Sequence, residues 1–268
     1  MNFAKQLSVN PGSGVKLSSI DPADTRGMDR DEAAKRHARN VERLTELGSM
    51  LWADNRYAML AVLQGMDTAG KDGTIRRVMS GINPRDCRVV SFKAPSQEEL
   101  DHDFLWRVHR ECPRRGEIGV FNRSHYEDVL IVRVRGLVKK EVWSARYDQI
   151  NRFEQHLAEN GTRIVKFFLH ISKAEQKERL EARLADPSKN WKMNPTDLEE
   201  RKLWDDYQRA YEDAISRCST AHAPWFIIPA DKKWFRDLAV SSIMVEMLEG
   251  MDLRYPKAEF DSSKIKVE

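Results

Sequence analysis

Cysteine is scarce in this sequence. There are three, Cys87, Cys112 and Cys218, with neither CxxC spacing nor a cluster of histidines beside them, which argues against a disulfide framework and against a zinc site. Long apolar runs are also missing. Residues 1–14 lack the apolar stretch of a signal peptide, and later apolar segments are far shorter than a membrane span. We therefore expect a cytoplasmic protein with no membrane partner.

A strong charge of one sign is absent as well. The 45 Lys and Arg residues nearly balance the 42 Asp and Glu residues, for a net charge of +3, so we expect no nucleic-acid partner. The 268 residues, 41% of them hydrophobic, are enough for one α/β domain. We expect a single domain over residues 1–268. Residues 1–28, rich in Ser, Pro, Gly and Asp without a period, are expected to be an extended arm.

Short apolar runs alternate with segments of helical period along the rest of the chain. The expected strands are residues 57–64, 87–92, 118–121, 163–171 and 225–228. The expected helices are residues 29–52, 97–110, 139–159, 174–185, 196–217 and 234–248. This alternation is typical of a parallel sheet with helices on both faces, in which ligands bind at the carboxyl ends of the strands. The predicted fold class is therefore α/β with a five-stranded parallel sheet.

The strongest local signal is the segment GMDTAGK, which fits the GxxxxGK phosphate-loop (Walker A) pattern between an expected strand and a helix. Glycines let main-chain amides turn inward around an anion, and the helix N-terminus adds positive potential. The lysine, Lys71, reaches the phosphates in transfer and is a candidate catalytic residue. The other candidate phosphate-binding residues here are Gly65, Ala69, Gly70, Gly73 and Thr74.

The position after Lys71 departs from the phosphate-loop pattern. It is Asp72, where a magnesium-binding Ser or Thr usually stands. Either Thr74 replaces that hydroxyl or another group holds the metal. Asp67, inside the loop, is the favoured candidate, its alternative role being a helix cap. The expected cofactor is Mg²⁺ or Mn²⁺.

A second polar group follows the third expected strand, in the segment VFNRSHYED. Nucleotide kinases of this kind carry a metal-positioning aspartate here, but this residue is Asn122, which brings no charge. Asp67 with Glu127 or Asp128 would then supply the anionic ligands. Arg123 is placed to neutralise the transferring phosphoryl group, although an ion pair with a neighbouring acid explains it equally well.

A basic helix face and an irregular segment follow the fourth expected strand. Arg179 and Arg183 are four residues apart and share one face of the expected helix, while Lys189 and Lys192 lie in the segment DPSKNWKMNP that comes next. Such a face is usually solvated surface. In a phosphate-loop kinase, however, a lid brings arginines over the transferred group at this place. We expect residues 174–195 to be a lid that delivers Arg183, with the other three cations binding phosphate.

Five longer motifs occur in order along residues 15–265: GMDTAGKDGT, SFKAPSQEELDHDFLWRVH, GVFNRSHYEDVLIVRV, RLADPSKNWK and APWFIIPADKKWFR. Together they resemble the family-2 polyphosphate kinases, and such a set is far more specific than a phosphate loop alone. The resemblance implies a three-layer α/β/α sandwich related to thymidylate kinase with a helical lid, magnesium dependence, and phosphoryl exchange between inorganic polyphosphate and nucleotides. The catalytic positions that it implies are Asp67, Lys71, Arg123 and Arg183.

The strand-end motif bears on the acceptor. Family members restricted to nucleoside diphosphates resemble FDRSWYNR, whereas this chain has FNRSHYED, which is similar to class III members acting on monophosphates and diphosphates. The resemblance thus implies reversible transfer from polyphosphate to AMP and ADP, ending in ATP, with guanine nucleotides as further candidate acceptors. The candidate acceptor-binding residues are Lys93, Arg107, His109, Asn122, Tyr126, Glu127 and Asp128. The candidate metal ligands are Asp67, Asn122 and Glu127.

The sequence leaves two other functions open. An ATP-dependent nucleoside monophosphate kinase would have the same fold and phosphate loop. A non-catalytic polyphosphate- or nucleotide-binding protein would explain Asp72 and Asn122 as lost metal positions, but Lys71, Arg123 and Arg183 argue against a loss of catalysis. We also expect the protein to be a homo-oligomer.

Overall fold

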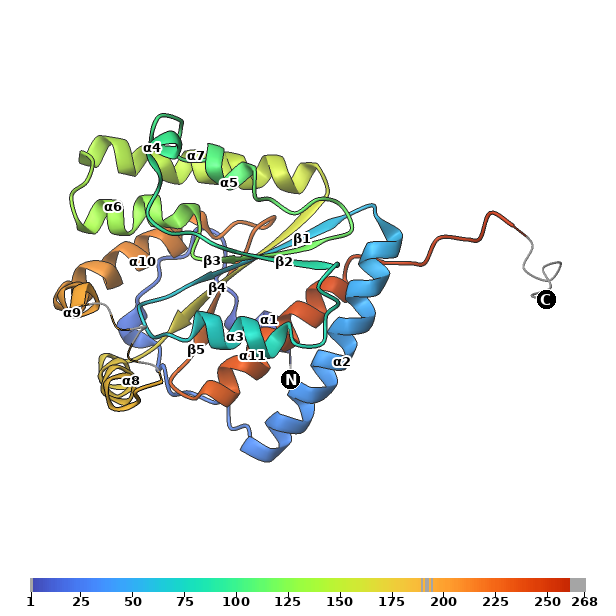
Figure 1. Cartoon of the computed structure of the whole chain (residues 1–268), viewed down its shortest axis with the longest axis horizontal. Coiled ribbons are helices and arrows are strands. Elements are labelled where there is room, and N and C mark those ends of the chain that lie inside the picture. Colours follow the sequence, from blue (N-terminus) through green and yellow to red (C-terminus); the bar gives the residue numbers. More distant parts are fainter. Residues whose placement is uncertain (1, 189, 191–192, 194, 261–268) are drawn as a thin grey trace.

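The computed structural model describes residues 2–188, 190, 193 and 195–260. At its centre is a sheet of five parallel strands in the order β2-β3-β1-β4-β5 (Figure 1). The strands are β1 (Ala58–Gln64), β2 (Cys87–Ser91), β3 (Ile118–Asn122), β4 (Thr162–His170) and β5 (Trp225–Pro229). Each begins and ends within one residue of an expected strand. The predicted fold class is therefore confirmed.

Helices cover both faces of the sheet (Figure 1). On one face lie α2 (Arg30–Asp54), α3 (Lys71–Val78) and α11 (Lys233–Glu249), and on the other α6 (Ile131–Val134), α7 (Lys140–Glu159) and α10 (Trp204–Cys218). The helices α8 (Lys173–Ala185) and α9 (Pro195–Lys202) stand at the end of the sheet where the strands finish. Shorter helices in the connections are α1 (Phe3–Leu7), η1 (Leu17–Ser19), α4 (Gln97–Leu100), α5 (Trp106–His109) and η2 (His125–Val129). No helix in the described part of the chain is long and apolar enough to cross a membrane.

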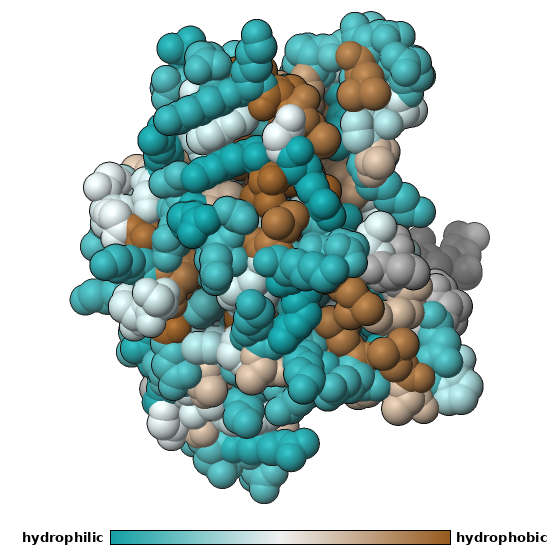
Figure 2. Space-filling view, turned by 90° about the vertical axis from the view of Figure 1, so that its left-hand side faces the viewer, coloured by the Kyte–Doolittle hydropathy of each residue, from teal (hydrophilic) through white to brown (hydrophobic). Residues whose placement is uncertain are grey.

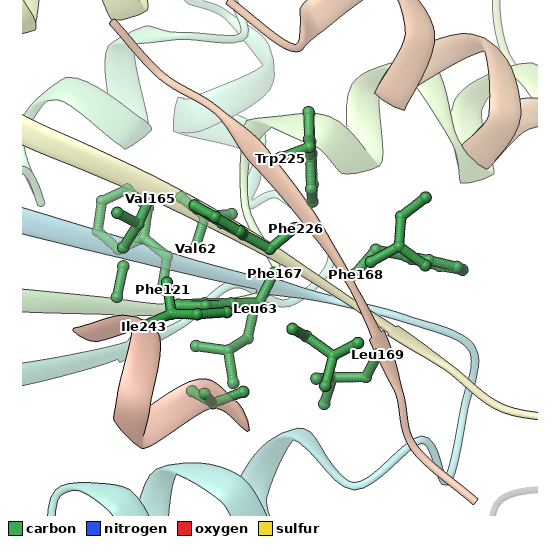
Figure 3. Packing of buried hydrophobic residues seen from close by; sticks show 14 of the residues in the cluster. Val62, Leu63, Phe121, Val165, Phe167, Phe168, Leu169, Trp225, Phe226 and Ile243 are labelled. Atoms are coloured by element: carbon green, nitrogen blue, oxygen red, sulfur yellow. The ribbon is translucent and has the colours of Figure 1, made fainter. Parts of the chain in front are cut away.

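The inner strands and β5 are apolar because helices bury both faces of the sheet, whereas the edge strand β2 has no fully buried residue. All seven residues of β1 are buried, as are all five of β5. In Figure 3, labelled side chains of β1, β3, β4 and β5 pack with Ile243 of α11; among them are Val62, Phe121, Phe167 and Phe226. A strand buried on both faces has no polar alternation. That explains why the strands stand out in the sequence as short continuous apolar runs.

Two expected helices are each divided in two. Residues 97–110 form α4 and α5. Between them the Asp103 carboxylate accepts a hydrogen bond from the main-chain N–H of Leu105 (3.0 Å), and side-chain bonds of this kind compete with the helical ladder. Residues 196–217 form α9 and α10, which meet at Leu203, where the backbone leaves helical geometry (φ −90°, ψ 20°).

The N-terminal arm is more ordered than an extended segment. It contains the helix α1, in which Phe3 is completely buried. Beyond α1, Ser8 forms an antiparallel bridge with Phe226, and the N–H of Val9 donates to the carbonyl of Trp225 (2.9 Å). The arm thus covers part of the outer edge of β5, where unpaired main-chain groups would otherwise be open to another chain.

Candidate active site

An open pocket of about 860 Å³ lies at the carboxyl ends of β1 and β3 and is bordered by α3, α8 and α11. Its lining carries nine Lys and Arg side chains against four Asp and Glu side chains. Figure 2 looks onto this end of the molecule, whose surface is largely hydrophilic. A concave surface with this excess of positive charge attracts a polyanion. The predicted site residues that line the pocket are Asp67, Gly70, Lys71, Gly73, Lys93, Asn122, Arg123, Arg179 and Arg183.

The phosphate loop has a backbone that few residues can adopt. Gly70 has a φ of +103°, and a Cβ there would lie 1.9 Å from Nη1 of Arg236, so any larger residue would displace that buried guanidinium. Thr68 also has a positive φ of +61°, which costs a non-glycine residue about 1–2 kcal/mol. Strain of this kind clusters at active sites and ligand-binding loops, and here it lies in the loop that leads into α3.

Lys71 is the first residue of α3 and lies inside the loop. Its Nζ donates to the carbonyl oxygens of Gly65 (2.8 Å) and Met66 (3.3 Å). Burial, assisted by the positive charge of Arg123, lowers the pKa of Lys71 to about 8. The Lys71 ammonium is held by neutral carbonyls and lies beside another cation. An approaching anion therefore stabilises its charged form by supplying an opposite charge.

Asp67 faces the basic helix. Its Oδ2 lies 3.7 Å from Nη1 of Arg183, which is also 3.5 Å from Oδ2 of Asp197 on α9. This Oδ2 of Asp67 is buried and, within the described part of the chain, accepts no hydrogen bond. The structure therefore brings Arg183 of α8 beside the Asp67 carboxylate of the phosphate loop, where the two form an ion pair.

Asp72 and Asn122 meet across the opening between α3 and β3. The Asn122 amide donates to Oδ1 of Asp72 at 2.6 Å and to the Ser91 hydroxyl at 3.4 Å. Thr74 does not take the place of the missing Ser or Thr, because its buried hydroxyl donates to the Gly70 carbonyl (3.1 Å) inside α3. No group of three or more His, Cys, Asp or Glu side chains suited to a metal occurs among the described residues. Mg²⁺ needs only one or two carboxylates when phosphates complete its shell, so Asp67 with Asp72 fits it.

Arg123 follows β3 with a φ of +62°. Its N–H donates to the Leu63 carbonyl of β1 (3.0 Å), which continues the sheet by one residue and fixes where the side chain enters the pocket. Glu127, expected as a metal ligand, does not line the pocket. Its Oε1 accepts a hydrogen bond from Gln64 (3.0 Å) at the end of β1.

Besides Glu127, which was expected to bind the acceptor as well, four other expected acceptor-binding residues lie outside the pocket lining. Tyr126 is completely buried, with its hydroxyl donating to Glu154, and Asp128 pairs with Arg146 (3.0 Å). Both follow from the tight turn of η2, which buries His125, Tyr126 and Val129 and leaves Asp128 half-buried. The remaining two are Arg107, which donates to the Lys93 carbonyl (2.9 Å), and His109, whose ring packs on Phe153 (5.5 Å between centroids).

Arg179 lines the pocket, but its guanidinium is engaged by the main chain. Its guanidinium donates to four main-chain carbonyls, those of Thr68, Ala69, Ala230 and Asp231, at 2.6–3.1 Å. It thus ties the phosphate loop to the end of β5 and has few donors left for a ligand. Ala69, expected to bind phosphate, is buried and contributes one of these four carbonyls. Lys189 and Lys192 lie outside the described residues.

Four cations of the lining were not identified from the sequence: Arg76, Arg77, Lys233 and Arg236. Arg236 is almost completely buried, and its Nη1 contacts the Ala69 carbonyl at 3.4 Å. Its signal in the sequence was the motif PADKKWFR after the last strand. Only the strand order shows that this motif and α3 both flank the phosphate loop.

The model of the family described as Polyphosphate kinase 2 matches residues 27–256. The chain belongs to the polyphosphate kinase 2 family. It is 51% identical to the AMP/ADP-polyphosphate phosphotransferase of Meiothermus ruber over 98% of this chain and 100% of the relative. It is 52% identical to the ADP-polyphosphate phosphotransferase of Rhodopseudomonas palustris over 94% of this chain and 92% of the relative.

A solved structure shares the whole architecture. The crystal structure of polyphosphate kinase 2 from Arthrobacter aurescens TC1 superposes with a TM-score of 0.95 at 44% identity, over 98% of this chain and 94% of that chain. Membership of the polyphosphate kinase 2 family confirms the resemblance seen in the sequence. The two relatives differ in the acceptors that their names state, so family membership leaves the choice between AMP and ADP to the site itself.

Proposed function

We propose that this polyphosphate kinase 2 transfers the terminal phosphoryl group of inorganic polyphosphate to nucleoside monophosphates and diphosphates, taking AMP to ADP and ADP to ATP, reversibly. The observation that carries the proposal is the pocket lining, with nine cationic and four anionic side chains around a phosphate loop. Binding of an adenylate group alone requires fewer cationic side chains than this. A chain of phosphates carries one negative charge on each unit and so matches the larger number. The names of the relatives from M. ruber and R. palustris support it.

The chemistry assigned to the chain is positioning and charge neutralisation. A phosphate oxygen of the acceptor attacks the terminal phosphorus, while the bond to the next bridging oxygen of polyphosphate breaks and that oxygen keeps the electron pair. Lys71 and Arg123 face the transferring group from the sheet, and Arg183 faces it from α8. An ionised phosphate is already a nucleophile, so no side chain is needed as a general base.

A divalent cation, Mg²⁺ or Mn²⁺, completes the proposed site. It would neutralise phosphate oxygens and hold donor and acceptor in line. Asp67 is the proposed principal ligand, because it lines the pocket and its buried Oδ2 lies beside Arg183 without accepting a hydrogen bond in the described part of the chain. Asp72 and Asn122 would orient the water ligands of this cation. Glu127 does not line the pocket, so it would act on the cation only through its negative charge.

The proposal is tested by following nucleotide products over time from AMP, ADP, GMP and GDP, each with polyphosphate and magnesium and with no ATP added. ADP should accumulate from AMP before ATP appears. The guanine nucleotides show whether the base is read. If AMP is converted only when ATP is added, the protein is a nucleoside monophosphate kinase instead.

Asp67→Asn should raise the magnesium concentration for half-maximal rate by at least about tenfold, because an amide oxygen is a weaker ligand than a carboxylate. The matched control is Asp197→Asn, since Asp197 also lies beside Arg183 but belongs to α9. A magnesium titration of the initial rate checks this. The same shift in both variants would mean that Asp67 acts only by pairing with Arg183.

Asn122→Asp and Glu127→Asn should change the ratio of AMP to ADP turnover more than the rate on the better acceptor. A monophosphate places its α-phosphate where a diphosphate places its β-phosphate, so charge at this edge distinguishes them. In Asn122→Asp a second carboxylate would lie 2.6 Å from Asp72, which only a bound cation offsets. Ser91→Ala is the control. Equal losses with AMP and ADP would assign both residues to chemistry in general.

A further inference from the structure

We infer that Tyr126, His125, Glu154 and Lys166 form a buried polar network that positions Arg123 for phosphoryl transfer. The inference rests on the proposed function and adds positioning residues to it. None of the four side chains lines the pocket. All four are completely buried on the α7 side of the sheet, beneath the turn that carries Arg123.

The four side chains are joined through Glu154 of α7. The Lys166 ammonium of β4 donates to Glu154, to the Tyr126 hydroxyl (2.8 Å) and to the Cys218 carbonyl at the end of α10 (2.7 Å). The Tyr126 hydroxyl donates to Glu154 (2.9 Å), and Nε2 of His125 donates to the same oxygen (3.2 Å). Burial opposes the ionisation of Glu154, but Lys166 and His125 together lower the pKa of this carboxyl group, so Glu154 is ionised.

The stability of the fold alone does not explain this network. Removing a lysine and a glutamate from water costs several kcal/mol per ion, and well-packed apolar residues of similar volume often serve a core equally well or better. What a network of hydrogen bonds provides is direction, because each bond restricts both distance and angle. Here those bonds connect α7, β4 and α10 to η2.

The same turn carries the pocket residue. Arg123 comes two residues before His125, has a positive φ of +62°, and lines the pocket. Between them Ser124 is buried and its hydroxyl accepts a hydrogen bond from the N–H of Tyr126 (3.2 Å). The turn is therefore short and rigid, so a shift of Tyr126 in the core moves the guanidinium of Arg123 on the other side. An error of about 1 Å in such a group can cost about a hundredfold in rate.

The first test compares Tyr126→Phe with Tyr147→Phe. Tyr147 is also buried and its hydroxyl also has a partner, but that partner is Arg133 of α6. Tyr126→Phe should lower kcat about tenfold or more, with a KM for the nucleotide within about twofold of wild type. Tyr147→Phe should lose as much thermal stability while keeping its kcat. Equal losses of kcat in the two variants overturn the inference.

A double-mutant cycle shows whether the effect passes through Arg123. In an Arg123→Ala background, Tyr126→Phe should lower the residual kcat no further, because the group that it positions is gone. Its effect on the melting temperature should remain. A full additional loss of kcat in that background contradicts a positioning role.

A second variant guards against simple misfolding. Glu154→Gln combined with Lys166→Met removes both buried charges together, so the melting temperature should stay near the wild-type value, while kcat should still fall about tenfold or more. Hydrogen exchange at the amides of residues 123–129 should be faster in this variant and in Tyr126→Phe than in wild type or Tyr147→Phe. Unchanged exchange with unchanged kcat overturns the inference. Hydrogen exchange is measured without substrate, so it tests the positioning role independently of the proposed function. If the proposed function is wrong, the wild-type protein itself lacks the activity.

Discussion

Arg183→Ala should lower kcat by about a thousandfold, the size of effect that arginines supplied to a transferring phosphoryl group have. Arg183 of α8 forms an ion pair with the Asp67 carboxylate, at 3.7 Å between Nη1 and Oδ2. Its positive charge therefore stands over the loop where negative charge is redistributed during transfer. The KM for the nucleotide should change much less, because α8 contributes to the transition state more than to ground-state binding.

Lys177→Ala is the matched control for Arg183→Ala. Lys177 is on the same helix, but its side chain is exposed and pairs with Glu181, so its removal should leave kcat within about twofold of wild type. Initial rates with saturating polyphosphate measure both variants. If Arg183→Ala retains most of its activity, α8 is a solvated basic helix and the proposed lid over residues 174–195 is wrong.

Lys71→Ala should lower kcat by about a hundredfold to a thousandfold, corresponding to about 2.7–4 kcal/mol of lost transition-state stabilisation. The Lys71 ammonium is held inside the loop by two carbonyl oxygens, so a phosphate oxygen can take their place without any rearrangement of the chain. Circular dichroism and thermal melting should show a folded variant. Turnover near the wild-type value in that folded protein would falsify the role given to Lys71.

The lowered pKa of Lys71 predicts a pH dependence. With a pKa of about 8 in the ligand-free protein, the lysine loses its proton, and with it the positive charge, as pH rises through about 8. Because kcat/KM reports ionisations of the free enzyme, kcat/KM for polyphosphate should fall above this pH. The residual activity of Lys71→Ala should lack that decline. A decline of equal size in Lys71→Ala would assign it to another group.

The five strands and the phosphate loop could be predicted because local sequence decides them. Strands buried on both faces appear as continuous apolar runs, and the GMDTAGK segment needs its glycines for its own backbone. The divided helices could not be predicted in this way. At Asp103 a side-chain bond to the main chain competes with helical period, and that competition is settled by packing beyond the segment.

The candidate site was predictable for residues at the ends of the strands and not for those beyond the first turn. Asn122 ends β3, Arg123 follows it, and Lys71 ends the phosphate loop after β1, so the topology places them together. Tyr126 lies only three residues after Arg123, but η2 turns it into the core. Arg236 could not be placed either, because its position depends on how α11 packs beside α3.

The most direct test of the account is a single-turnover reaction of this protein with terminally radiolabelled polyphosphate and AMP, in the presence of magnesium and with no ATP. The account predicts that the label appears first in the β-phosphate of ADP, and that Lys71→Ala and Arg183→Ala slow this step by the factors given above. Label that remains in polyphosphate, or that appears only as free phosphate, would contradict it.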